Sequence, residues 1–97
     1  MNGNGRGRTE YPLPGDIDVT NASEIGDRLC ELITSHDAVL VVGSAVTFVE
    51  SRGLAMMARV QRLADECECD LSWRGFSAPV LRTMHVTGLD HYLRIEA

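Results

Sequence analysis

The sequence contains no lysine and few aromatic residues, which make up 5% of its 97 residues. Arginine supplies all 9 basic side chains, and 14 acidic residues outweigh them to give a formal net charge of -5. A chain of this charge lacks the broad positive surface that binds nucleic acid phosphates or anionic membranes. We therefore expect no direct nucleic acid partner, and a basic protein partner fits the charge better.

Long apolar runs are also missing. No stretch approaches the roughly 20 apolar residues of a membrane-spanning helix, and the polar start MNGNGRGRTE has no signal-peptide core. We expect a cytoplasmic protein with no membrane insertion. A chain of this length is expected to form one compact domain with a single core. We assign residues 1–10, which are polar and rich in glycine and arginine, to a flexible arm, and residues 11–97 to the folded domain.

Cysteine is scarce as well: Cys30, Cys67 and Cys69 do not make the even disulfide framework of a small secreted protein. The C-x-C pair, with His85 and His91 far along the chain, is weak evidence for zinc, and we expect no metal site and no cofactor. A thiol redox sensor built on Cys67 and Cys69 is a distant alternative. The acidic residues around this pair are expected to lower the reactivity of its thiols.

Hydrophobic periodicity indicates alternating strands and helices. Helices are predicted at about 22–34, at 53–67 and between Ser77 and Gly88, and strands at 38–42 and 70–74, with an irregular strand in 11–19 and a short strand or turn in 92–96. Asn21 and Glu24 have the spacing of a capping box. The unbroken apolar run AVLVV at 38–42 is typical of a central strand covered on its faces. This alternation predicts an α/β fold with a parallel or mixed sheet.

The segment TFVESRGLAMM places Ser51 where a strand-like run gives way to a helix. The free N–H groups of a helix's first turn carry partial positive charge, so they can accept a phosphate on a serine at that point. The simpler interpretation is that Ser51 caps the helix with its hydroxyl. Spacing alone leaves both interpretations open.

Three blocks of sequence, GDIDVTNASEIGDRL, VTFVESRGLAMM and VLRTMHVTGLDHYL, occur in the order and spacing of the STAS domain. They resemble its anti-sigma-factor antagonist branch in particular. The resemblance implies a single α/β domain with a mixed central β-sheet and helices packed mainly on one face. It also implies a protein that binds an anti-sigma factor with a serine-kinase fold, releases a sigma factor, and is switched off by phosphorylation at Ser51. A serine phosphatase would reset it.

The same resemblance assigns the site residues. Ser51 is the phosphorylation site, and the partner-binding residues are Asp18, Glu50, Ser51, Arg52, Gly53 and Met56. For Asp18 a second interpretation is equally open, in which its side chain only starts the turn into the helix. In the family pattern an aspartate stands at Glu50 and a small residue at Arg52. We expect Arg52 to pair with Glu50 while Ser51 is unmodified. The resemblance implies that Met56 or Met57 reaches the partner surface, whereas methionine more commonly fills gaps in a core.

Other function classes fit less well. No Ser-His-Asp order and no G-x-S-x-G elbow occurs, so we expect no enzyme. The main alternative is a STAS subunit that binds the ATPase of an ABC-type lipid transporter without phosphorylation, a role with which Arg52 is compatible.

Overall fold

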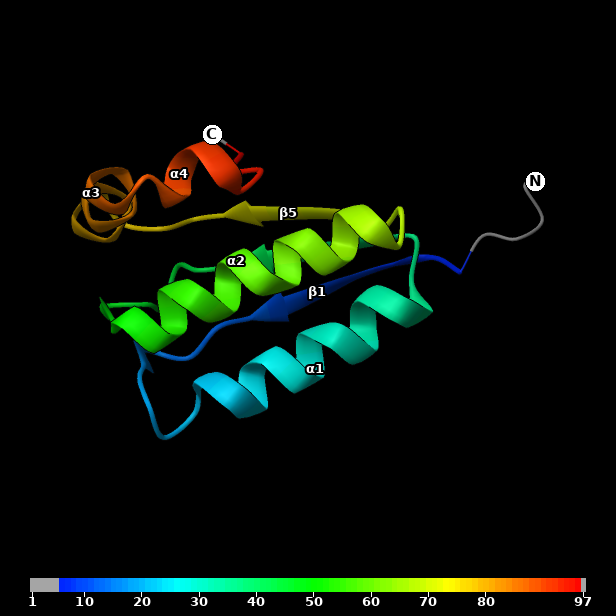
Figure 1. The fold of residues 1–97 in the computed structure, drawn as a ribbon, viewed down its shortest axis with the longest axis horizontal. Coiled ribbons are helices and arrows are strands. Elements are labelled where there is room, and N and C mark those ends of the chain that lie inside the picture. The colour runs from blue at the N-terminus through cyan, green and yellow to red at the C-terminus, as the bar shows by residue number, and fades with distance from the viewer. Residues whose placement is uncertain (1–5, 97) are drawn as a thin grey trace.

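Strands and helices alternate along the chain, as Figure 1 shows. The computed structural model describes residues 6–96. The elements are β1 Arg8–Pro12, β2 Asp16–Ile17, α1 Ala22–Ser35, β3 Ala38–Val42, β4 Phe48–Val49, α2 Ser51–Glu66, β5 Asp70–Arg74, α3 Ala78–Thr87 and α4 Leu89–Tyr92. The prediction of an α/β fold in one domain is confirmed.

The strands form two small parallel sheets. One has the strand order β1-β3-β5, and the other pairs β2 with β4. Every ladder between strands in the described part of the chain is parallel, so the expectation of a mixed sheet is corrected. The reason is the connections: each pair of neighbouring strands is joined by a crossover that contains a helix, which returns the chain to its starting edge.

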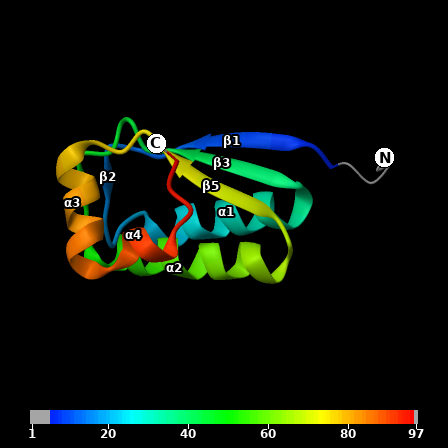
Figure 2. The ribbon, with the colours of Figure 1, turned by 90° about the horizontal axis from the view of Figure 1, so that it is seen from above.

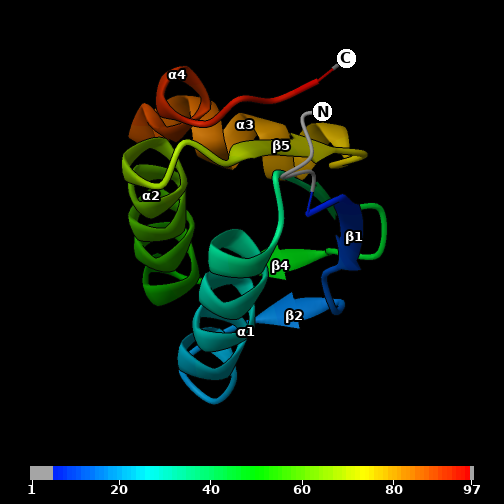
Figure 3. The ribbon, with the colours of Figure 1, turned by 90° about the vertical axis from the view of Figure 1, so that its right-hand side faces the viewer.

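Helices α1 and α2 lie under one face of the β1-β3-β5 sheet, and α3 crosses the end where the strands finish (Figures 2 and 3). The prediction that the helices pack mainly on one face is confirmed. The largest buried side chains between helices and sheet are Ile17, Leu29, Ile33, Val39, Val41, Met56, Met57, Leu71, Trp73 and Met84. Each contributes about 1.5–3 kcal/mol of burial free energy, so this layer holds the fold together.

The second face of the sheet has no helix over it among residues 6–96 (Figure 2). Along β3, Val39 and Val41 are buried, whereas Ala38, Leu40 and Val42 are half-buried. The prediction that this strand is covered on both faces is therefore wrong. In a sheet that is covered on one face, every second residue of a strand is buried. Because the residues of β3 on the open face are apolar as well, the sequence showed no alternation of apolar and polar residues.

The first strand begins earlier than the composition suggested. Arg8 pairs with Ala38 in the β1–β3 register, so residues 8–10 belong to the sheet and not to a flexible arm. Arg6 also contacts the domain, since its backbone N–H donates to Asp37 Oδ2 at 2.7 Å and its guanidinium donates to the carbonyl of Thr34 at 3.0 Å. The first five residues of the expected arm lie outside the described residues.

A buried polar contact joins β5 to α2. The Trp73 indole is fully buried and donates to Gln61 Oε1 at 2.9 Å. Trp73 also bridges to Ile95 in parallel orientation, so the C-terminal segment lies beside β5. None of the helices within residues 6–96 is long and apolar enough to cross a membrane.

Candidate functional site

Ser51 is the first residue of α2 and follows β4 after the single residue Glu50. It lies at the end of the molecule where the strands finish and both long helices begin (Figure 1). Glu50, not Ser51, is the N-cap residue, and its side chain makes no cap hydrogen bond. The Ser51 side chain is exposed and its hydroxyl forms no hydrogen bond with residues 6–96. The interpretation of Ser51 as a helix cap is therefore wrong.

The first turn of α2 can attract an anion. The helix begins with the N–H of Leu54, which donates to the carbonyl of Glu50 at 3.0 Å. The N–H groups of the three residues before Leu54 have no acceptor inside the helix, and no carboxylate caps them. They carry the partial positive charge of a helix N-terminus, directly beside the exposed Ser51 hydroxyl.

Gly53 brings this turn against the β2–β4 pair. A Cβ on Gly53 would lie 2.7 Å from Cγ2 of Ile17 and 2.8 Å from Cγ1 of Val49, closer than side-chain carbons approach. Gly53 is buried and packs against the strands, so the need for glycine here is steric. Its assignment as a partner-contact residue stays a prediction.

Glu50 connects the two loops at this end of the molecule. Its Oε1 accepts a hydrogen bond from the backbone N–H of Val19 at 3.1 Å. Arg52 is exposed and forms no ion pair with residues 6–96, so the expected pair between Arg52 and Glu50 is absent. The Glu50 carboxylate is turned toward the Val19 loop instead, which leaves the Arg52 guanidinium in solvent.

Asp18 belongs to the turn that precedes α1. Its Oδ1 accepts hydrogen bonds from the hydroxyl and the backbone N–H of Thr20, and these two bonds lower the pKa of Asp18. The Asp18 N–H donates to Asn21 Oδ1 at 2.9 Å. Asn21 is the N-cap of α1, but its side chain makes no cap bond, so the predicted capping box with Glu24 does not form. Asp18 is half-buried and adjoins Val19, which Glu50 contacts.

The two methionines of α2 are not at the surface. Met56 is 1% exposed and Met57 is 0% exposed. The expectation that one of them reaches the partner surface is wrong, because both face the layer between α2 and the sheets. The Met56 side chain lies in the core, and its role in partner binding stays a prediction.

Two exposed apolar side chains lie on the strands and loops beside Ser51. Val19 is 62% exposed and Phe48 is 53% exposed. The sequence contained no sign of this, because β2 and β4 have two residues each and no periodicity can be read from so short a strand. We call Asp18, Val19, Phe48, Glu50, Ser51 and Arg52 the Ser51 surface. A groove of about 130 Å³ between β4, α2 and α3 adjoins it and is lined in part by Phe48.

The two cysteines of the C-x-C pair differ in exposure. Cys69 is buried, and this burial, followed by the negative charge of Asp70, raises the pKa of its thiol. Cys67 is exposed at the C-cap of α2. A thiol with a raised pKa is mostly protonated at neutral pH and reacts slowly. These observations do not favour the redox-sensor alternative.

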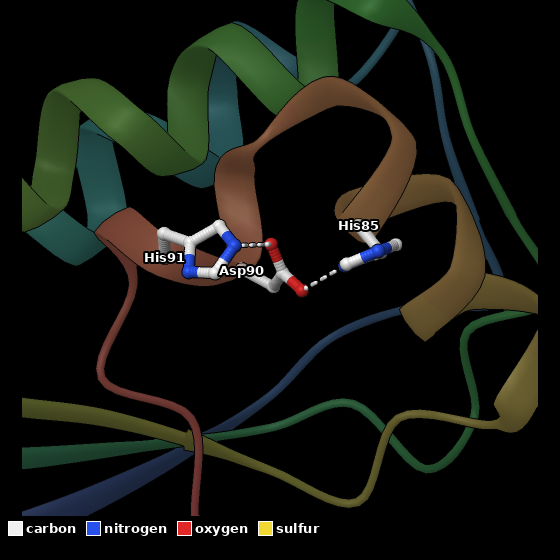
Figure 4. A group of neighbouring side chains, drawn as sticks. All are labelled: His85, Asp90 and His91. Atoms are coloured by element: carbon white, nitrogen blue, oxygen red, sulfur yellow. Dashed lines mark hydrogen bonds and ion pairs between the residues drawn. The ribbon is translucent and has the colours of Figure 1, made fainter.

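A second group of polar side chains joins α3 to α4. His85 lies in the last turn of α3, and Asp90 and His91 lie in α4, with Gly88 at a φ of 80° between the two helices. Figure 4 shows the Asp90 carboxylate between the two imidazole rings. His85 Nδ1 lies 2.9 Å from Asp90 Oδ2, and His91 Nε2 lies 3.8 Å from Asp90 Oδ1. In the sequence the three residues have the spacing His-x4-Asp-His. The turn at Gly88 between the two helices brings their side chains together.

Comparisons with known proteins agree on the fold. The family model described as "Mlab, STAS domain" matches residues 11–95. The unphosphorylated anti-sigma factor antagonist SpoIIAA has a TM-score of 0.76 and 15% identity, over 93% of this chain and 81% of that chain. The STAS domain of the SulP transporter from Vibrio cholerae has a TM-score of 0.72 and 11% identity, over 91% and 71%.

The phosphorylated form of SpoIIAA, a Bacillus cell fate determinant, is also similar, with a TM-score of 0.69 and 14% identity over 92% of this chain and 83% of that chain. A search of curated proteins finds no match to the sequence. Identities this low establish a shared fold and leave the individual role to be argued from the site.

Proposed function

Because the family model covers residues 11–95, the chain belongs to the STAS domain family, and we propose that it is an anti-sigma-factor antagonist. In this proposal it is a regulatory binding protein and not an enzyme. The unphosphorylated Ser51 surface binds a cytoplasmic anti-sigma factor with a serine-kinase fold, and this frees a sigma factor. The kinase phosphorylates Ser51 and ends the complex, and a serine phosphatase restores it.

The observation that carries the proposal is the exposed and unbonded hydroxyl of Ser51 at the start of α2. A kinase can reach this hydroxyl without unfolding the helix. Phosphorylation adds about -1.5 to -2 charge, and the free N–H groups of the first turn stabilise that charge. Both states of Ser51 therefore fit the same backbone.

Release of the partner follows from the charge of the Ser51 surface. Asp18 and Glu50 already carry negative charge beside Ser51, and Val19 and Phe48 supply exposed apolar area for an interface. A phosphate dianion placed in a formed interface must lose its water and lies close to these carboxylates. An unfavourable free energy of about 1.4 kcal/mol already lowers affinity tenfold, so phosphorylation switches binding without a large conformational change.

The test uses purified protein, the cognate kinase and ATP. We expect one phosphate on wild type, none on Ser51→Ala, and an affinity for the kinase that falls at least about tenfold after phosphorylation. Ser44, Thr47 and Ser77 are exposed hydroxyl residues near the same end and serve as matched positions, since alanine there should leave phosphorylation intact. Phosphate found on one of these residues, with Ser51 unmodified, contradicts the proposal.

A second candidate function follows from the similarity to a transporter STAS domain and from the exposed Arg52. In that role the Ser51 surface binds the ATPase of an ABC-type lipid transporter and needs no phosphorylation. Arg52 supplies a cation for an acidic partner. Co-purification from native cells separates the two candidates, because the first predicts a serine-kinase-fold protein and the second an ATPase subunit.

A further inference from the structure

The group formed by His85, Asp90 and His91 has the composition of a transition-metal site. Two imidazoles and one carboxylate are a ligand set that zinc and its chemical neighbours prefer over magnesium or calcium. One ligand atom from each residue can be chosen so that all three lie within 4.8 Å of one another. No core side chain belongs to the group, so it is separate from the packing that holds the domain together.

One contact of the group is a hydrogen bond, and the other has the spacing of two ligands of a shared ion. Bonds of about 2.0–2.2 Å to zinc place two ligand atoms of a tetrahedral site about 3.4 Å apart. His91 Nε2 and Asp90 Oδ1 are 3.8 Å apart, too far for a hydrogen bond and near that value. His85 Nδ1 is 2.9 Å from Asp90 Oδ2, a hydrogen bond that His85 would exchange for a bond to the ion.

An independent observation concerns Asp90 Oδ1. Among the buried side-chain nitrogen and oxygen atoms of residues 6–96, this oxygen is the one without a hydrogen-bond partner. A buried carboxylate oxygen without a donor is unfavourable, and native structures rarely leave one unsatisfied. A cation bound between Oδ1 and His91 satisfies it.

We propose that His85, Asp90 and His91 bind one divalent transition-metal ion of the zinc class. Both histidine side chains are exposed, at 71% and 81%, so the rings can rotate toward a shared ion without moving the core. Three protein ligands leave a fourth position, which water fills. The ion joins the last turn of α3 to α4 across the turn at Gly88 (Figure 4).

The experiment is a calorimetric titration of the full chain with zinc chloride at neutral pH. We expect one zinc per chain in wild type. His85→Ala and His91→Ala should each weaken binding by at least about tenfold, because each removes one of three ligands. Both residues are exposed, so these variants should fold normally, which circular dichroism verifies. Zinc should also raise the melting temperature of wild type and not that of the variants.

Matched controls come from the same chain. His36 is the remaining histidine and lies at the end of α1, so His36→Ala should bind zinc as wild type does. Cys67→Ser tests the exposed thiol in the same way. Titration with cobalt provides a spectroscopic check, because nitrogen and oxygen ligands give no thiolate-to-cobalt charge-transfer band. Unchanged affinity in both His85→Ala and His91→Ala, or a loss of binding in Cys67→Ser, overturns the proposal, and so does a wild type that binds no zinc.

Discussion

Substitution of Gly53 by alanine tests whether the start of α2 depends on close packing. The added Cβ would lie 2.7 Å from Cγ2 of Ile17 and 2.8 Å from Cγ1 of Val49, whereas ordinary contacts are 3.4–4 Å. The contacting atoms of Ile17 and Val49 must therefore move away from the new Cβ by about 0.6–0.7 Å. Ile17 is 0% exposed and cannot move aside into solvent.

Two opposing terms set the size of the effect. Overpacking of a rigid site costs about 1–3 kcal/mol, and replacement of glycine by alanine inside a helix recovers up to about 1 kcal/mol. We expect a net loss of about 1–2 kcal/mol, which lowers the melting temperature of a domain of this size by about 5–10 °C. Thermal and urea unfolding followed by circular dichroism measure both quantities.

Arg52→Ala is the matched control, since it changes the neighbouring residue in the same turn. Arg52 is exposed and unpaired among the described residues, so its loss should change stability by less than about 0.5 kcal/mol. Val49→Ala removes one of the two clashing atoms and should cost less in the Gly53→Ala background than in wild type. A Gly53→Ala protein as stable as wild type would refute the steric argument, and Gly53 would then be open to a role in partner contact.

Two further predictions concern the hydrogen bonds of single side chains. Thr20→Val should raise the pKa of Asp18, because it removes the hydroxyl bond that stabilises the carboxylate. The bond from the backbone N–H of residue 20 survives the substitution, so part of the lowering remains. Since the pKa of Asp18 is lowered in the folded state, the stabilisation from Asp18 is present above pH about 4 and is lost as the pH falls through the folded pKa. An NMR titration of the Asp18 carboxyl carbon measures this pKa, and the same pKa in Thr20→Val as in wild type contradicts the prediction. Gln61→Met should destabilise by about 1–3 kcal/mol, because it leaves the buried Trp73 N–H without its acceptor. Urea unfolding measures this loss, and a loss of the same size in the Trp73→Phe background would show that the hydrogen bond is not its cause.

Local signals in the sequence predicted the regular elements well. The bounds of β3 and β5 match the predicted strands, and α1 extends the predicted range by one residue. The stop of α3 at Gly88 was predicted from the residue type, because a left-handed φ of 80° favours glycine. These features depend on neighbours within a few residues, so the order of amino acids is enough to specify them.

The candidate site was predicted in part. Ser51 was placed at the strand-to-helix junction from its position between two patterns, and the structure has it there. Its phosphorylation remains a proposal. Three details required the structure: the hydroxyl is not a cap, Arg52 does not pair with Glu50, and Met56 is in the core. Each depends on where a side chain points relative to distant parts of the chain.

What the sequence by itself determined is the three longer helices and the strands β3 and β5, because periodicity and turn residues act over a few positions. Only the tertiary structure decided that Arg8 joins the sheet, since its partner Ala38 is far along the chain. The same holds for the one-sided cover of β3, which depends on where the helices lie. Contacts between segments are set by the packing of the whole domain, and no short window of sequence contains that information.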